Sequence, residues 1–333
     1  LVEAVQRMPE NEEFSRRIEF SDLIRHYFPF PLDHAMMLIY HVYLMLTLMT
    51  YIIQSGQVVD YIILDSFGCA PGLRLSVDGG SHLICGTHRD SVTPFGEEAI
   101  LSSSMCIIVL VCIPLAMKNL DDNILLQWAA IVGLSVMAAY WAVFMASQPN
   151  FPHALPAVTS SQTSLVGTVL FNFAFMSALP SWLNEKRPGV PVARSFGYVV
   201  AVYTALGVLG GMALPPLSNS GQNLFSKLNE SGSVVAQSSV ALYPILQNFT
   251  SIPVLAIFIR YNLQASGLSR GLATFVAFGV PWLLSIPFYT GRGLDAIAET
   301  GGLATSSVIN FLVPSVAALR AWLAMPREKI CEI

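Results

Sequence analysis

Charged side chains are scarce in this sequence. Of its 333 residues only 11% are Asp, Glu, Lys or Arg, whereas 54% are hydrophobic. A typical soluble domain carries about 25% charged residues. The composition therefore indicates an integral membrane protein in contact with the lipid bilayer, and the small net charge of -4 gives no indication of nucleic-acid binding.

Metal-binding and catalytic motifs are also missing. None of the five cysteines forms a C-x-x-C pair or adjoins a histidine, and no nucleophile elbow is present. We therefore expect neither an enzyme nor a bound cofactor. Cys106 and Cys112 lie in an apolar run, where thiols act as small hydrophobic groups. Cys69 and Cys85 share a polar loop and would form a disulfide only if that loop faces an oxidising compartment, so bridged and free forms both stay open.

A start signal is absent as well. The first residue is Leu1, and no basic segment with a short apolar core precedes the long apolar runs. We expect the sequence to be a fragment of a longer protein.

Long apolar runs predict an all-α integral membrane protein with about eight transmembrane helices. A bilayer is crossed by a helix of about 20 residues. Residues 1–33 precede the first run as a polar N-terminal segment, a polar outer loop covers 65–98, and residues 324–333 form a tail. The predicted spans are 36–64, 100–117, 124–145, 163–183, 196–214, 235–259, 272–288 and 303–323.

One short amphipathic helix is predicted before the first span. Phe20, Leu23, Ile24 and Tyr27 follow the spacing i, i+3, i+4 and i+7 and share one helix face. That apolar face would either lie on the membrane or pack on the protein's own surface.

The distribution of basic residues predicts the orientation. With residues 1–33 placed in the cytoplasm, 13 of the 17 Lys and Arg residues fall on the cytoplasmic side and 4 fall on the opposite side. This bias follows the positive-inside rule and supports both the orientation and the span count. The four residues on the opposite side are Arg74, Arg89, Lys227 and Arg292.

The fourth predicted span has an unusual composition. It carries Asn172 among phenylalanines, meets Pro180 and ends in the charged turn that begins at Glu185. A proline removes a backbone hydrogen bond, and a bilayer core offers no replacement unless other helices or a water-filled cavity provide one. A broken helix of this kind suggests a binding site.

Three stretches resemble the amino acid/auxin permease family of sodium- or proton-coupled amino acid transporters. Residues 171–185 resemble its sixth helix, with a Phe-x-Phe core, Leu-Pro and an acidic turn. Residues 251–260, with Ser-Ile-Pro-Val and a terminal Arg, resemble its eighth helix. Residues 113–120 resemble the hairpin between its fourth and fifth helices, and the likeness in order and topology extends over nearly all of 20–325.

The resemblance implies part of an inverted-repeat fold of the leucine-transporter type. The eight spans would correspond to family helices three to ten, without the first two or any after the tenth. Residues 34–146 would be the remnant of the first repeat, and residues 163–323 the whole second repeat, so this chain by itself should not transport.

The implied function is ion-coupled secondary active transport of amino acids by alternating access. The alternative is a non-transporting amino acid sensor with the same fold. The implied location is the plasma membrane or a vacuolar or lysosomal membrane, and the implied coupling ion is sodium or a proton. The sequence does not specify the amino acid or the oligomeric state.

The same resemblance implies a substrate site at Phe171, Asn172, Phe173, Ala174 and Phe175. Unwound backbone and half-helix ends can bind the carboxylate and ammonium groups of an amino acid without a buried side-chain charge. Ordinary helix packing of these residues is the alternative. Residues 176–178 depart from the His-Pro often found here in the sodium-coupled subgroup, so substrate preference is not carried over.

Two further groups of polar residues are candidates for ion handling. Thr250 and Ser251 are adjacent hydroxyls in mid-span that would suit sodium, or would bond back to their own helix. His41, Gln57 and Asp60 lie on the first span, where polar groups suggest a relay. Asp60 near the outer end could instead simply be hydrated.

Asn229 provides a test of the predicted orientation. It begins the sequon Asn-Glu-Ser in a loop on the side with few basic residues, so we expect one N-linked glycan in eukaryotic cells. Glycosidase digestion should lower the apparent mass of the protein, and Asn229→Gln should abolish that difference. Glycosylation of a sequon inserted in the loop 189–194 would contradict the orientation.

Overall fold

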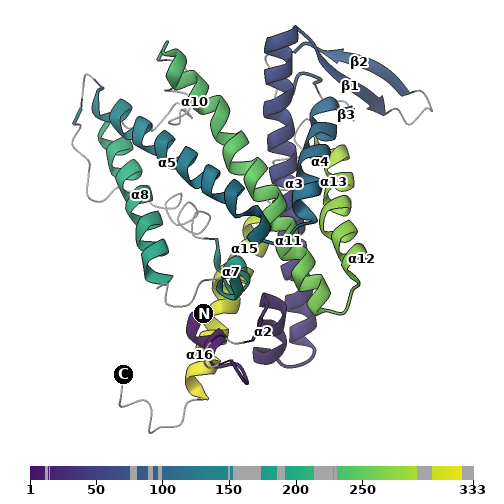
Figure 1. The fold of residues 1–333 in the computed structure, drawn as a ribbon, viewed down its shortest axis with the longest axis vertical. Coiled ribbons are helices and arrows are strands. Elements are labelled where there is room, and N and C mark those ends of the chain that lie inside the picture. The colour runs from purple at the N-terminus through teal and green to yellow at the C-terminus, as the bar shows by residue number, and fades with distance from the viewer. Residues whose placement is uncertain are drawn as a thin grey trace. The chain divides into compact units, whose positions relative to one another are not determined.

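The structure is a computed structural model that describes residues 1–11, 14, 16–75, 81–88, 93–96, 100–148, 151–152, 174–185, 192–213, 228, 231–290 and 302–324. Within these residues six helices are long and apolar enough to cross a membrane (Figure 1). They support a multi-pass, helical membrane protein. The six are Leu32–Phe67, Asp121–Ala146, Arg194–Ala213, Val234–Ala265, Arg270–Phe288 and Ala304–Leu323.

Two of the eight predicted spans have no full-length counterpart among the described residues. The predicted span 100–117 begins as a strand, β3 (Ile100–Ser102), and continues as the 14-residue helix α4 (Ser103–Ala116). The predicted span 163–183 lies mostly outside the described residues and is represented by the short helix α7 (Leu179–Glu185). The count of eight therefore stays a prediction.

The polar loop after the first span contains a small antiparallel sheet, although no strand was predicted there. Strands β1 (Ala70–Leu75) and β2 (Ser81–Gly86) form a hairpin, and β3 pairs with β1 in the order β2-β1-β3. Cys69 and Cys85 are joined in a disulfide across the hairpin, with a Cα–Cα distance of 5.5 Å. The sheet was missed because its strands have only three to six residues, and because β3 pairs with β1 rather than with its neighbour in the sequence, β2.

The described chain divides into two compact units. Unit 1 comprises residues 1–122, 163–186 and 251–333, and unit 2 comprises residues 123–162 and 187–250. Each unit takes helices from both predicted repeats. A structural repeat is defined by the order and symmetry of its helices, and the two units are defined by contacts. The repeat assignment therefore stays a prediction.

Unit 1 is built around the long helix α3 (Leu32–Phe67), which packs against α4, α13, α15 and α2 (Figure 1). Helix α2 (Phe20–Tyr27) is the predicted amphipathic helix, and its four apolar residues are buried in the protein. The ring centroids of Phe20 and Tyr40 are 4.7 Å apart. Of the two alternatives, the apolar face therefore packs on the protein itself.

Unit 2 contains α5 (Ile124–Ala146), α8 (Val192–Ala213) and α10 (Val234–Pro244). Trp141 of α5 packs in a buried apolar cluster with Met145 and residues of the other helices. Its indole N–H donates a hydrogen bond of 2.9 Å to the Ser239 hydroxyl. This bond satisfies the polar group of an otherwise apolar contact between α5 and α10.

Three spans contain a π-helical segment before a proline. In a regular α-helix the carbonyl four residues before a given residue accepts the N–H of that residue, and proline has no N–H to donate. In each of the three spans the carbonyl that loses its partner in this way lies in the π-helical segment. The prolines are Pro253, Pro281 and Pro314. The segments are η3 (Ile245–Phe249) before α11 (Thr250–Ala265), η4 (Phe275–Gly279) between α12 (Arg270–Thr274) and α13 (Val280–Ser285), and η7 (Val308–Leu312) between α15 (Leu303–Ser307) and α16 (Val313–Leu323).

Short helical turns complete the description. They are α1 (Val2–Gln6), η1 (Asp121–Asn123) before α5, η2 (Met176–Ala178) before α7 and η5 (Ile286–Phe288) after α13. Two of them, η1 and η5, form the first and last turns of the candidate spans Asp121–Ala146 and Arg270–Phe288.

Arg260 of α11 holds the C-terminal end of α4. Its guanidinium donates to the carbonyl oxygen of Ala116 at 2.7 Å and to that of Lys118 at 2.6 Å, and only 1% of the residue is exposed. The last carbonyls of a helix have no partner within the helix and attract cations. Arg260 therefore satisfies groups that would otherwise be buried without a hydrogen bond.

We expect Arg260→Met to lower the free energy of unfolding by about 2 kcal/mol, because it leaves the buried Ala116 carbonyl and the partly buried Lys118 carbonyl unpaired. Arg260→Lys should recover part of this loss, since one ammonium group cannot reproduce the guanidinium fork. Thermal unfolding in detergent would measure both. The matched control is Arg270→Met, which removes a more exposed hydrogen bond of 3.0 Å to Met117 O and should cost less. Equal losses in the two Met variants would contradict this assignment.

Candidate functional site

The backbone that leads into α7 is the first candidate site. Ala174 and Phe175 form a turn, the 3-10 turn η2 follows, and α-helical backbone starts at Leu179. Of the five predicted substrate residues, only Ala174 and Phe175 are described. Phe171, Asn172 and Phe173 lie outside the described residues, so their role stays a prediction.

A buried side-chain amide from the last span is hydrogen-bonded to the backbone just before α7. The Asn310 side-chain oxygen accepts the backbone N–H of Ser177 at 3.1 Å. The Asn310 amide N–H in turn donates to the Ser306 carbonyl at 3.3 Å. Asn310 lies in η7 and is only 1% exposed. The Ser177 N–H in the 3-10 turn before α7 is thus satisfied by a residue 133 positions away.

Sequence reasoning gave Asn310 no role in the site. An amide within an apolar span, four residues before Pro314, was the available signal. The Asn310 amide, which can both donate and accept hydrogen bonds, thus lies beside the 3-10 turn that precedes α7. Such groups can bind a solute that carries both a carboxylate and an ammonium group.

The predicted ion-site hydroxyls have different environments. The Thr250 hydroxyl donates to the Leu246 carbonyl at 2.6 Å, which is the alternative in which the side chain bonds back to its own helix. Ser251 is half-buried, and it is the first residue of α11 that belongs to unit 1. A role for Ser251 in ion binding stays a prediction.

The residues predicted as a polar relay on α3 do not form one group. His41 is bonded to the Met37 carbonyl of its own helix at 2.8 Å. Nineteen residues separate it from Asp60, which corresponds to roughly 28 Å along a helix. Gln57 and Asp60 do share a partner, because Gln57 donates to the Tyr289 carbonyl at 3.1 Å and the Tyr289 hydroxyl donates to Asp60.

Asp60 belongs to a buried cluster of oxygen atoms at one end of unit 1. The residue is 0% exposed, so the alternative of a hydrated carboxylate is wrong. The Ser104 hydroxyl lies 3.4 Å from the Tyr289 hydroxyl and 2.6 Å from the hydroxyl of Ser102. Gly56 allows the Tyr289 ring to approach, since a Cβ atom at this position would lie 2.9 Å from the ring. The cluster links α3, the start of α4 and the end of the span that contains α13.

Side chains of the N-terminal segment are hydrogen-bonded to side chains of α7. Ser181 donates to one Glu19 carboxylate oxygen at 2.6 Å, and Asn184 donates to the other at 3.1 Å. Arg17 pairs with Glu19 at 3.2 Å and with Glu185 at 3.0 Å. Helix α7 is therefore linked to the N-terminal segment by its side chains, while Asn310 holds the backbone just before it.

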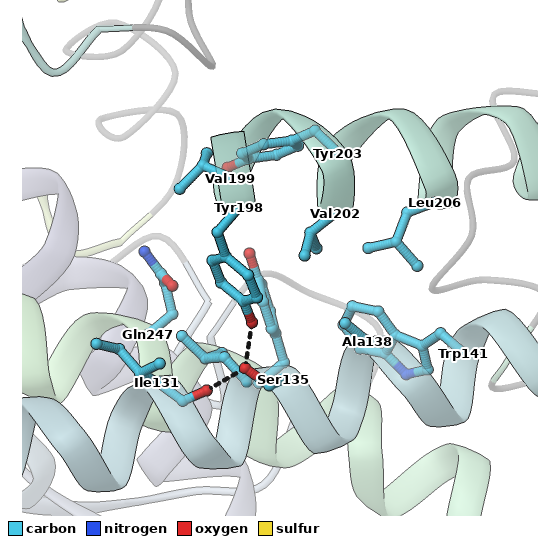
Figure 2. Close-up of a pocket in the computed structure, with 12 residues that line it drawn as sticks. Ile131, Ser135, Ala138, Trp141, Tyr198, Val199, Val202, Tyr203, Leu206 and Gln247 are labelled. Atoms are coloured by element: carbon cyan, nitrogen blue, oxygen red, sulfur yellow. Dashed lines mark hydrogen bonds between the residues drawn. The ribbon is translucent and has the colours of Figure 1, made fainter. Parts of the chain in front are cut away.

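A separate cavity of about 210 Å³ lies within unit 2, between α5, α8 and the η3 end of α10. Figure 2 shows Tyr198 and Val202 pointing from α8 toward α5, where the Tyr198 hydroxyl meets that of Ser135. Among the described residues that line it, none is charged. The cavity contains none of the predicted substrate or ion residues.

The remaining site predictions have mixed outcomes. Within the described residues, no group of three or more His, Cys, Asp or Glu side chains could hold a metal ion. Asn229 lies outside the described residues. No protein-family model, curated protein or solved structure matches this chain.

Glu19 gives a prediction about pH. Burial raises the pKa of its carboxyl above the ordinary 4.5, although the hydrogen bonds from Ser181 and Arg17 oppose the shift. A raised pKa means that the folded protein binds this proton more tightly than the unfolded chain does. The free energy of unfolding should therefore fall as the pH rises from about 4.5 through the raised pKa.

Thermal unfolding between pH 4 and pH 7 would measure this slope. Glu19→Gln should reduce it, because the amide does not titrate; the slope that remains comes from other carboxyls such as Glu185, whose pKa is also raised by burial. Ser181→Ala should extend the slope to higher pH, because it removes a hydrogen bond that favours the charged carboxylate. A slope in Glu19→Gln equal to that of the unaltered protein would contradict the assignment.

Proposed function

We propose that this protein is an ion-coupled secondary active transporter of amino acids. The observation that carries the proposal is the turn and 3-10 backbone before α7, where the Ser177 N–H is bonded to the buried amide of Asn310. The proposal takes this backbone as the break in the predicted span 163–183. A discontinuous helix is costly in a membrane and is tolerated where it lines a cavity or is satisfied by protein groups. Transporters commonly bind their substrates at such breaks.

The chemistry of an amino acid fits this kind of site. Its carboxylate can be bound by N–H groups at the start of a half-helix, and its ammonium group by free carbonyl oxygens. Neither contact needs a buried side-chain charge. In this view Phe171, Asn172 and Phe173 complete the site next to Ala174 and Phe175.

Several finer statements belong to the same proposal. The N-terminal segment is cytoplasmic, the coupling ion is sodium or a proton, and Ser251 contributes to the ion site. The sequence resemblance and the distribution of basic residues support these statements. The membrane is the plasma membrane or one of vacuolar or lysosomal type.

The contacts of α7 suggest which parts would move. Asn310 holds the backbone before α7, and Glu19 binds side chains of α7 itself. In an alternating-access cycle at least one of these two links would have to change. The Asn310 contact is the direct link to the proposed substrate site, because it is made at the break.

Asn310→Leu tests the site. We expect it to lose binding of the amino acid that the unaltered protein binds, by about tenfold or more, because an unpaired N–H and a lost amide alter the break. Binding of radiolabelled amino acids to the purified protein in nanodiscs would measure the effect. Counterflow of the bound amino acid in proteoliposomes made from the full-length protein would then measure transport, and binding without flux would favour the sensor.

The matched control is Asn262→Leu. Asn262 is also buried, at 0% exposed, and its side-chain oxygen also accepts a backbone N–H, that of Ser21 at 3.0 Å. The control therefore removes the same kind of hydrogen bond away from the break. Equal loss of binding in both variants would show a general effect on stability and would contradict the site.

A further inference from the structure

A buried carboxyl group of α3 has no counter-ion among the described residues. Asp60 is 0% exposed, and none of the ion pairs found in the described part of the chain includes it. Its Oδ2 atom contacts the Tyr289 hydroxyl, whereas its Oδ1 atom has no hydrogen-bond partner there. A carboxylate buried in this way is costly, and the group avoids the cost by taking up a proton.

The elements around Asp60 supply no basic side chain to balance its charge. Of the elements that contact α3, the segments α4, α13, α15 and η7 contain no charged residue, and α2 packs near the other end of α3. Strand β1 contributes Arg74 and the first turn of α4 contributes Cys106, and both are exposed. On α3 itself the next carboxyl group, that of Asp65, is also exposed. The titratable group in contact with Asp60, among the residues described, is Tyr289.

A chain of three hydroxyl groups beside Asp60 can serve both of its protonation states. The Tyr289 hydroxyl contacts Asp60, and the Ser104 hydroxyl lies 3.4 Å from that of Tyr289. The Ser102 hydroxyl lies 2.6 Å from that of Ser104. A hydroxyl can donate to one neighbour and accept from another. The Tyr289 O–H therefore donates to a charged carboxylate, and it turns toward Ser104 when a protonated carboxyl donates to the Tyr289 oxygen.

This cluster lies at the end of unit 1 that carries the disulfide. Helix α3 ends at Phe67, seven residues after Asp60 and roughly 10 Å further along the helix. Cys69 of the disulfide follows, and strand β3 of the sheet ends at Ser102 (Figure 1). Disulfides persist in oxidising compartments such as the cell exterior. The cluster is therefore near the outer side of the membrane, as the proposed orientation also requires.

From these observations we propose that Asp60 is a proton-binding site loaded from the outer side, with the hydroxyls of Tyr289, Ser104 and Ser102 as its relay. The inference rests on the proposed function and narrows the coupling ion to a proton. The carboxylate takes a proton from a hydronium ion, which becomes water, and gives it back to water when the carboxylate forms again. Sodium fits this site less well, because the direct contact of the Tyr289 hydroxyl with Oδ2 leaves no room for an ion between the two oxygens.

Infrared difference spectroscopy tests the proton site directly. The full-length protein in lipid nanodiscs would be titrated with acid, and the C=O stretching bands of protonated carboxyl groups would be followed. We expect Asp60→Asn to lose one buried carboxyl band, because the amide keeps the shape of the side chain and binds no proton. Asp65→Asn is the matched control, since it makes the same change at an exposed position of the same helix, and it should keep that band. Identical spectra for the unaltered protein and Asp60→Asn would overturn the proposal.

Transport in proteoliposomes separates this inference from the proposed function. A proton gradient, acidic on the outer side, should drive amino acid accumulation by the unaltered protein and by Asp65→Asn. Asp60→Asn should lose accumulation and keep counterflow, which needs no net movement of protons and shows that the variant is folded. Absence of counterflow in the unaltered protein would remove the transporter, and the infrared band would still decide on the proton site. Accumulation by Asp60→Asn, or accumulation by the unaltered protein on a sodium gradient alone, would overturn proton coupling at Asp60.

A second variant tests the relay without altering the carboxyl group. Tyr289→Phe keeps the ring that packs against Gly56 and removes the hydroxyl that contacts Asp60. We expect proton-driven accumulation to slow about threefold to tenfold, because one hydrogen bond to the carboxyl group is lost. Counterflow should persist. An unchanged rate of proton-driven accumulation in Tyr289→Phe would overturn the relay.

Discussion

Backbone groups that prolines and helix ends leave unpaired dominate the architecture of unit 1, because hydrocarbon offers them no hydrogen bonds. The N–H of Ser177 is satisfied by Asn310, and the carbonyls at the end of α4 are satisfied by Arg260. In both cases a buried polar side chain comes from a helix more than 130 residues away. Such bonds tie together helices whose apolar surfaces alone would specify their contacts poorly.

The same constraint gives α7 its position in the proposed mechanism. Helix α7 is short and follows a 3-10 turn. Asn310 links the backbone before it to the last span, and Glu19 links its side chains to the N-terminal segment. The first contact is neutral and the second involves a carboxylate whose pKa is raised by burial. A conformational change at α7 would therefore exchange two different kinds of polar contact, only one of which responds to pH.

Unit 2 meets the membrane in another way. Its helices have few buried polar links, and a neutral cavity lies between them. The cavity lining places hydroxyl and amide groups among aromatic rings, whereas the region before α7 in unit 1 is joined to its neighbours by buried polar side chains.

Composition and apolar periodicity by themselves determined that the chain is helical and multi-pass, and six predicted spans correspond to long apolar helices. They also located the amphipathic helix at Phe20–Tyr27, because this depends on local order along the chain. Only the tertiary structure decided that Asn310 holds the break, that Asp60 is buried against Tyr289, and that a sheet forms after α3. Each of these depends on which distant segments meet, and local sequence carries no record of that.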